Sequence, residues 1–143
     1  MGTATEMGTD RAPVMAETRL LAPSCRILVV DNYDSFVYTI IGYLEQLGAE
    51  CIVARNDAVP MAEDGVPDLS GFDGVLISPG PGNPLTAGRT LDVIGECTRT
   101  STPMFGVCLG LQSLAHYFGA TVTHAPQLMH GKTSVITTTQ SGL

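Results

Sequence analysis

The sequence is poor in basic residues and has no long apolar run, and each shortage excludes a class of partner. Seven Lys and Arg stand against 14 Asp and Glu among 143 residues, which gives a net charge of −7. Without a basic cluster, binding to nucleic acid or to an anionic membrane is not expected. No apolar stretch reaches the roughly 18 residues of a membrane-spanning helix, and the N-terminus lacks the layout of a secretion signal. We therefore expect a cytoplasmic protein.

The cysteines are too few and too scattered for a disulfide framework or a zinc site. There are four of them, Cys25, Cys51, Cys97 and Cys108, and three histidines. No Cys-x-x-Cys pair occurs, and no histidine stands at the spacing of zinc ligands. The prediction is a reducing compartment, free thiols and no metal or other cofactor.

Apolar runs and helical periods alternate from residue 26 onward. Residues 1–25 show no sustained period and are predicted to form a poorly ordered extension. Strands are predicted at 27–30, 49–55, 74–77 and 103–107, with further strands at 120–123 and 133–138. Helices are predicted at 36–47, 90–99 and 109–118, and irregular structure at 56–71. This order indicates one α/β domain over 26–143, with a mostly parallel open sheet and helices on both faces.

The first two helices can be predicted in more detail. Ser35 stands where an N-cap is expected, and Gly48 stands where the first helix should end. The inward stripe of that helix is expected to consist of Phe36, Ile40, Tyr43, Leu44 and Leu47. In the second helix, the residues expected to face the core are Leu91, Ile94 and Cys97.

Cys108 stands between Gly106 and Gly110, where the fourth strand gives way to the third helix. A sharp strand-to-helix turn at this point lifts a side chain clear of the sheet and brings both glycines close to neighbouring backbone. The helix N-terminus favours the thiolate form of the cysteine. The pattern predicts a nucleophile elbow with cysteine in place of serine. The alternative is a small cysteine packed in a buried strand.

A second loop, at residues 78–84, follows another buried strand and alternates proline with glycine. In open α/β sheets, ligands bind at the carboxyl ends of the strands. The prolines fix the backbone, and the glycines let a substrate approach the N–H groups. Together with the N–H of Leu109, the loop can stabilise the oxyanion that forms when Cys108 attacks a carbonyl. The alternative is a rigid turn without a chemical role.

Four motifs in order and at matching spacing carry a resemblance to a known family. They are DNYDSF at 31–36, SPGPGNP at 78–84, GVCLGLQ at 106–112 and MHGKTS at 129–134. Together they resemble the class I (triad-type) glutamine amidotransferases, whose fold is flavodoxin-like. The first and last motifs point to the branch that serves anthranilate synthase or aminodeoxychorismate synthase. The resemblance covers residues 26 to about 134.

This resemblance implies roles for individual residues. Cys108 would attack the side-chain amide of glutamine to give a glutamyl thioester and ammonia. Gly80, Pro81 and Gly82 would line the glutamine site and, with Leu109, contact the oxyanion. Gln112 would hydrogen-bond the bound glutamine, the alternative being a solvated helix residue. The ammonia would pass to a chorismate-binding synthase subunit, on the route to tryptophan or to folate.

The histidines depart from the family pattern. The base of the family is a histidine followed two residues later by glutamate, and none of His116, His124 and His130 has that neighbour. The base would therefore lie beyond residue 143, and the chain is predicted to be a fragment that is inactive alone. Two alternatives remain at this stage. One is a non-catalytic protein that docks on the synthase, and the other is a thiol hydrolase, which the 78–84 and 129–134 motifs disfavour.

Overall fold

A computed structural model describes residues 25–139, so all but Cys25 of the predicted extension lies outside the described residues. The chain runs through eight elements in order: β1 (Arg26–Asp31), α1 (Val37–Gln46), β2 (Glu50–Arg55), β3 (Gly74–Ile77), η1 (Pro84–Thr86), α2 (Thr90–Thr100), β4 (Met104–Gly106) and α3 (Leu109–Tyr117). The predicted strands up to residue 107 and the three predicted helices are thus confirmed. The short 3₁₀-helix η1 was not predicted.

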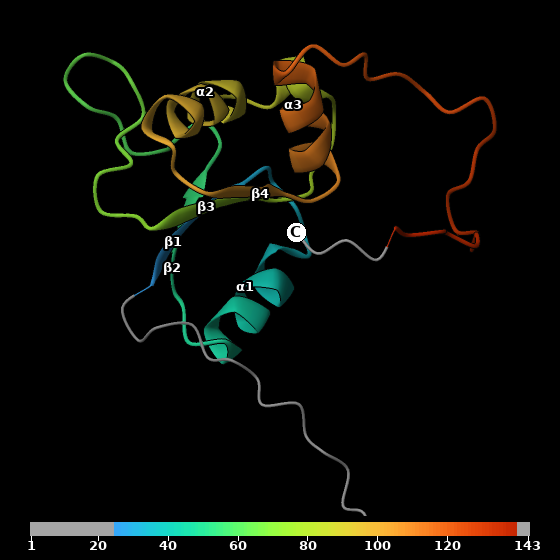
Figure 1. Ribbon diagram of the computed structural model, residues 1–143, viewed down its shortest axis with the longest axis horizontal. Helices are drawn as coiled ribbons and strands as arrows, with labels where there is room; N and C mark the ends of the chain where they lie inside the picture. Colours follow the sequence, from blue (N-terminus) through green and yellow to red (C-terminus); the bar gives the residue numbers. More distant parts are fainter. Residues whose placement is uncertain (1–24, 140–143) are drawn as a thin grey trace, which may run out of the picture.

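The four strands form one parallel sheet in the order β2-β1-β3-β4. Helix α1 lies on one face, and α2 and α3 lie on the other (Figure 1). The chain moves outward from β1 to β2 and then, in the opposite direction, from β3 to β4. Two right-handed connections that run in opposite directions place their helices on opposite faces. The carboxyl ends of β1 and β3 therefore form the switch point where such sheets bind ligands.

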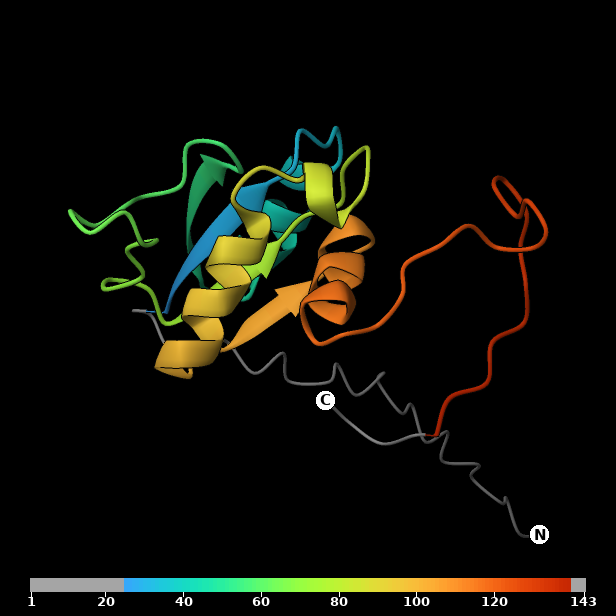
Figure 2. The ribbon, with the colours of Figure 1, turned by 90° about the horizontal axis from the view of Figure 1, so that it is seen from above.

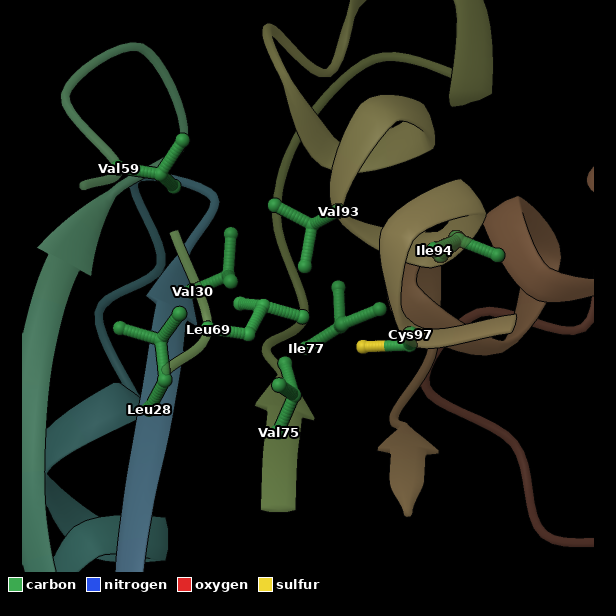
Figure 3. Packing of buried hydrophobic residues seen from close by; sticks show 9 residues of the cluster. All are labelled: Leu28, Val30, Val59, Leu69, Val75, Ile77, Val93, Ile94 and Cys97. Atoms are coloured by element: carbon green, nitrogen blue, oxygen red, sulfur yellow. The ribbon is translucent and has the colours of Figure 1, made fainter. Parts of the chain in front are cut away.

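Each face of the sheet has its own hydrophobic cluster, because successive strand residues point to opposite sides. On the α2 side, Leu28 and Val30 of β1 pack with Val75 and Ile77 of β3 (Figure 3). On the α1 side, Val29 and Leu76 pack with Val37 and Ile41. In β1, the side chains from Leu28 to Val30 are fully buried. A strand covered on both faces is an unbroken apolar run, which explains why β1 and β3 were predictable.

The connection from β2 to β3 is irregular, as predicted for residues 56–71, and it carries no helix. Its only ladder contact in the described chain is a single bridge between Met61 and Pro67. Val59 and Leu69 of this connection are nonetheless buried, and they pack into the α2-side cluster (Figure 3). The segment thereby covers part of the sheet that a crossover helix would otherwise cover.

The start of α1 differs from the prediction. The N-cap position is Phe36, and no side chain caps the helix. Ser35 is not the cap, because two carboxylates already hold the turn before it. The Asp34 N–H donates to Asp31 Oδ1 (3.1 Å), and the Phe36 N–H donates to Asp34 Oδ2 (2.9 Å). The helix therefore begins one residue later than expected.

The inward stripe of α1 is rotated accordingly. Val37 and Ile41 are buried, and Ile40 and Leu44 pack beside them, whereas Phe36 and Tyr43 are 67% and 63% exposed. The prediction was therefore wrong for both aromatic residues. The end of the helix is as predicted: Gly48 has φ 91°, and its N–H donates to the Glu45 carbonyl (2.9 Å).

No strand forms at 120–123 or 133–138, which corrects two predictions. After Gly119 (φ 93°) closes α3, the orange-to-red segment leaves the sheet (Figure 2). Val135 and Ile136 are 99% and 80% exposed. A β-strand requires a neighbour for its N–H and carbonyl groups, and none of the described strands lies beside this segment. No helix in the described part of the chain is long and apolar enough to cross a membrane.

Candidate active site

Val107 and Cys108 lie between β4 and α3, and the backbone of Cys108 makes the turn from strand to helix. That backbone has φ 52° and ψ −109°, a conformation that L-residues rarely adopt. On the strand side, the Val107 N–H donates to the Ile77 carbonyl (3.0 Å). On the helix side, the Gln112 N–H donates to the Cys108 carbonyl (2.9 Å). This is the geometry of the predicted elbow.

The two flanking glycines are required by close backbone contacts. A Cβ on Gly106 would lie 2.6 Å from the Leu111 nitrogen, and a Cβ on Gly110 would lie 2.9 Å from the Ile77 carbonyl carbon. Real Cβ atoms essentially never come within 3.0 Å of another heavy atom in this way. Both glycines therefore let the first turn of α3 press against β3 and β4, as the sequence predicted.

The thiol of Cys108 differs from the other three in its surroundings. Cys108 is exposed, Cys25 and Cys51 are half-buried, and Cys97 is buried. Burial, followed by the nearby Glu96 carboxylate, raises the pKa of the Cys97 thiol to about 11. Burial also raises the pKa of the Cys51 thiol. Cys108 is thus the most exposed of the four thiols, and Cys97 is held as a neutral core residue.

Backbone donors flank the elbow and the neighbouring loop. Between residues 25 and 139, no acceptor is found for the N–H groups of Leu109, Gly80 and Gly82. Free N–H groups of this kind are what an oxyanion requires. The Leu109 N–H belongs to the first turn of α3, and the other two belong to the loop that follows β3.

The loop after β3 is held at its far end by η1. The Asn83 side chain accepts the Leu85 N–H (2.9 Å), and Thr86 Oγ1 accepts the Asn83 N–H (3.1 Å), which together form a capping box. Gly82 has φ 85°, so a side chain at this position would be strained. Pro81 is exposed between the two glycines.

Gln112 and Gly82 meet in a hollow of about 470 Å³ beside the elbow. It is lined by residues 82–85 and 122–124 together with Gln112 and His116. Its lining is mixed polar and apolar, and it includes His116 and His124. Gly80, Pro81, Cys108 and Leu109 are not among the lining residues. The structure therefore brings two of the predicted substrate-binding residues together and leaves the thiol outside their hollow.

The base for the thiol is not provided by the described residues. The Cys108 thiol makes no hydrogen bond within residues 25–139, and none of the three histidines bonds to it. No group of three metal-binding side chains occurs in the same range.

Sequence reasoning missed a cluster of buried polar residues beneath the loop after β3. Asn32, Asn56 and Ser78 are each the first residue after a parallel strand, and Thr90 is the first residue of α2. Asn32 is 2% exposed, and Ser78 and Thr90 are fully buried. The only sequence signal was this recurrence of a polar residue directly after each of three parallel strands.

Comparison with known proteins agrees with this geometry. The family model described as "Glutamine amidotransferase class-I" matches residues 28–143. Anthranilate synthase component 2 of Mycobacterium tuberculosis (strain H37Rv) is 50% identical over 119 residues, which are 82% of this chain and 50% of that protein. Aminodeoxychorismate synthase component 2 of Escherichia coli (strain K12) is 44% identical over 117 residues, which are 82% of this chain and 60% of that protein.

A solved structure shows the same arrangement of strands and helices. It is described as a GMP synthase subunit of Thermoplasma acidophilum, and it superposes with a TM-score of 0.59 at 28% identity. The match covers 73% of this chain and 50% of that one. The chain spans about half the length of the curated relatives it matches. The family match, the parallel α/β fold and the cysteine elbow agree, and the chain belongs to the class-I glutamine amidotransferase family.

Proposed function

We propose that Cys108 is the nucleophile of a glutaminase, within an amidotransferase domain of which residues 26–143 form the N-terminal part. The observation that carries the proposal is the backbone of Cys108, at φ 52° and ψ −109°. Strained backbone conformations cluster at active sites, where they present a side chain to a substrate. No other cysteine of the described chain combines exposure with a helix N-terminus.

The reaction begins with attack of the Cys108 thiolate on the side-chain carboxamide carbon of glutamine. A C–S bond forms, and the carbonyl oxygen becomes an oxyanion that accepts hydrogen bonds from the N–H groups of Leu109 and of the 80–82 loop. The oxyanion then collapses, the C–N bond breaks and the nitrogen takes a proton. Ammonia departs, and a glutamyl thioester remains on Cys108. Water hydrolyses the thioester to glutamate and regenerates the thiol.

Substrate binding falls to residues near the elbow. Gln112 hydrogen-bonds the glutamine, and Gly80, Pro81 and Gly82 line its site. Support comes from the hollow that Gln112 shares with Gly82. The proton transfers need a base, and the family resemblance implies a histidine followed two residues later by glutamate. We assign that pair to a part of the protein beyond the described residues.

The ammonia is passed to a second subunit that uses chorismate. This part of the proposal rests on relatives named component 2 of anthranilate synthase, of aminodeoxychorismate synthase or of both. The two products stay as alternatives, because the relatives of both kinds are similarly close. A component of the first kind serves tryptophan synthesis, and one of the second kind serves folate synthesis.

Substitution of the nucleophile tests the proposal in the full-length protein bound to its synthase. Cys108→Ala is expected to abolish product formation from glutamine and to leave product formation from added ammonia intact, because free ammonia bypasses the glutaminase. Cys25→Ala, which removes a half-buried thiol just before β1, is the matched control and should retain both activities. Equal loss of both activities in Cys108→Ala would contradict the assignment.

A second candidate is a docking protein that binds the synthase without hydrolysing glutamine. It is favoured by one observation, the lack of a hydrogen-bonding histidine beside the Cys108 thiol in the described chain. A full-length complex that uses ammonia but shows no glutamine-dependent activity would support this candidate over the enzyme.

A further inference from the structure

A cluster of four polar side chains lies at the switch point of the sheet, directly below the loop that follows β3. Asn32, Asn56 and Ser78 follow β1, β2 and β3, and Thr90 opens α2. All four are buried. Buried polar groups destabilise a fold unless each finds a partner, so a cluster at the ligand-binding edge of the sheet calls for a specific role.

Asn32 is the centre of this cluster. Its Oδ1 accepts from Asn56 Nδ2 (2.9 Å) and from Thr90 Oγ1 (2.9 Å). Its Nδ2 donates to the Ser78 carbonyl (2.9 Å), and its backbone N–H donates to Ser78 Oγ (2.9 Å). The two bonds at Oδ1 fix the orientation of the amide. The amide in turn fixes the carbonyl group from which the loop departs.

The loop is therefore held by its carbonyl groups, and its N–H groups stay free. Ser78 Oγ donates to the Pro79 carbonyl (2.7 Å), which extends the hold by one residue. Gly80 then lies on Asn32 so closely that a Cβ would be 3.0 Å from the Asn32 carbonyl carbon and nearer still to its oxygen. The far end is held by the Asn83 cap. The N–H groups of Gly80 and Gly82 lie between these two anchors.

We propose that Asn32 is a positioning residue for catalysis. It holds the 78–82 loop in the position at which the N–H groups of Gly80 and Gly82 can hydrogen-bond the oxyanion. The inference rests on the proposed glutaminase function. Asn32 does not touch the substrate and acts only through Ser78 and Gly80. A hydrogen-bond donor displaced by about 1 Å can lower a rate about 100-fold. The 78–82 loop therefore needs a residue such as Asn32 to fix the position of its N–H groups.

Substitutions in the full-length protein with its synthase test the proposal. Thr90→Val keeps the shape of the side chain and removes one of the two donors to Asn32 Oδ1, and Thr90→Ser restores that donor. Thr98→Val is the matched control, because Thr98 lies on the same helix and its hydroxyl bonds, within residues 25–139, only to the Ile94 carbonyl (2.8 Å). Asn32→Asp keeps the oxygen that accepts from Asn56 and Thr90, and it removes the side-chain donor to the Ser78 carbonyl, because an ionised carboxylate only accepts.

Four measurements are made on each variant: kcat and KM for glutamine, product formation from ammonia, the rate of Cys108 alkylation by iodoacetamide, and the melting temperature. The expected result is a kcat lowered about 10-fold in Thr90→Val and about 100-fold in Asn32→Asp, in line with a misplaced oxyanion donor. We expect KM within about 2-fold of wild type, because a positioning defect acts on the transition state. Thr90→Ser should recover the kcat, and Thr98→Val should match wild type.

Alkylation needs the thiol but no oxyanion, so its rate should be the same in all variants. A kcat that stays at the wild-type level in Thr90→Val and Asn32→Asp would overturn the inference and leave the glutaminase proposal standing. A fall in the alkylation rate parallel to the fall in kcat would also overturn the inference and leave the glutaminase proposal standing, because the substitution would then have changed the reactivity of the Cys108 thiol. A wild-type complex that forms product from ammonia but hydrolyses no glutamine would overturn both proposals.

Discussion

The backbone conformation of Cys108 predicts that the side chain at this position destabilises the fold. At φ 52° and ψ −109° a Cβ is strained, and such a conformation raises the free energy of the folded state by about 1–3 kcal/mol. Cys108→Gly removes the Cβ and relieves the strain, but glycine adds about 0.5–1 kcal/mol of unfolded-state entropy. Cys108→Ala removes the thiol and keeps the strained Cβ. With the middle values of these ranges, about 2 kcal/mol of strain and about 0.75 kcal/mol of entropy, the glycine variant should be about 1 kcal/mol more stable than the alanine variant.

Urea unfolding of the two full-length variants, followed by far-UV circular dichroism, measures this difference. Because both lack the thiol, loss of its chemistry cancels in the comparison. The slope of the free energy of unfolding against urea should be equal in the two variants, so that the midpoint alone reports stability. An alanine variant as stable as the glycine variant, or more so, would refute the argument that the turn is strained.

Three further predictions concern other parts of the fold. Burial raises the pKa of the Cys97 thiol from 9.0 to about 11 in the folded state, so its contribution to stability is full below pH 9 and falls by about 2–3 kcal/mol as pH rises to 11. Urea unfolding of Cys97→Ala should lack this fall, and an equal fall in the variant and the wild type would contradict the prediction. Hydrogen bonds from Arg99 lower the pKa of the Glu96 carboxyl, so that the stabilisation is present above pH 4.5 and is lost as pH falls through the folded-state pKa. Arg99→Met should therefore lower the melting temperature at pH 7 more than at pH 3, and a pH-independent difference would contradict this. Gly80→Ala should destabilise by about 1–3 kcal/mol through overpacking, whereas Gly42→Ala, in mid-helix with nothing within 4 Å of the new Cβ, should stabilise by about 0.5–1 kcal/mol in urea unfolding; a similar effect at both positions would contradict the contact argument.

The strands and the elbow were predictable because their causes are local in sequence. The runs at β1 and β3 are apolar throughout, since both faces of the sheet are covered. Gly106 and Gly110 mark the turn because only glycine permits the backbone contacts on either side of Cys108. In each case a few consecutive residues carry the whole physical requirement.

The errors have causes that lie outside the local sequence. The apolar residues of α1 fit two inward stripes one residue apart, and packing on β1 and β2 selects the one through Val37 and Ile41. The β-branched residues at 133–138 have strand propensity, but that propensity is realised only against a neighbouring strand. The sequence of a segment alone determines neither how its helix is rotated on the sheet nor whether a neighbouring strand is present to pair with it.

The Asn32 cluster was missed for the same reason. Its hydrogen bonds join residues 24, 46 and 58 positions apart, and they exist only once three strand ends are side by side. Each of the residues looks like an ordinary loop polar residue when viewed alone. The site residues could be predicted because they form motifs, whereas the residues beneath them are brought together only by tertiary contacts.

These separations also set the order in which the site can be assembled. A chain is synthesised from its N-terminus, so residues early in the sequence are available before later ones. β1 and β2 come first, β3 and the start of α2 then supply Ser78 and Thr90, and Cys108 follows β4. All four residues of the Asn32 cluster thus precede Cys108 in the sequence. The residues of the Asn32 cluster are therefore already in the chain when the elbow and its thiol are added, whereas their long-range contacts form slowly because loop closure must precede them.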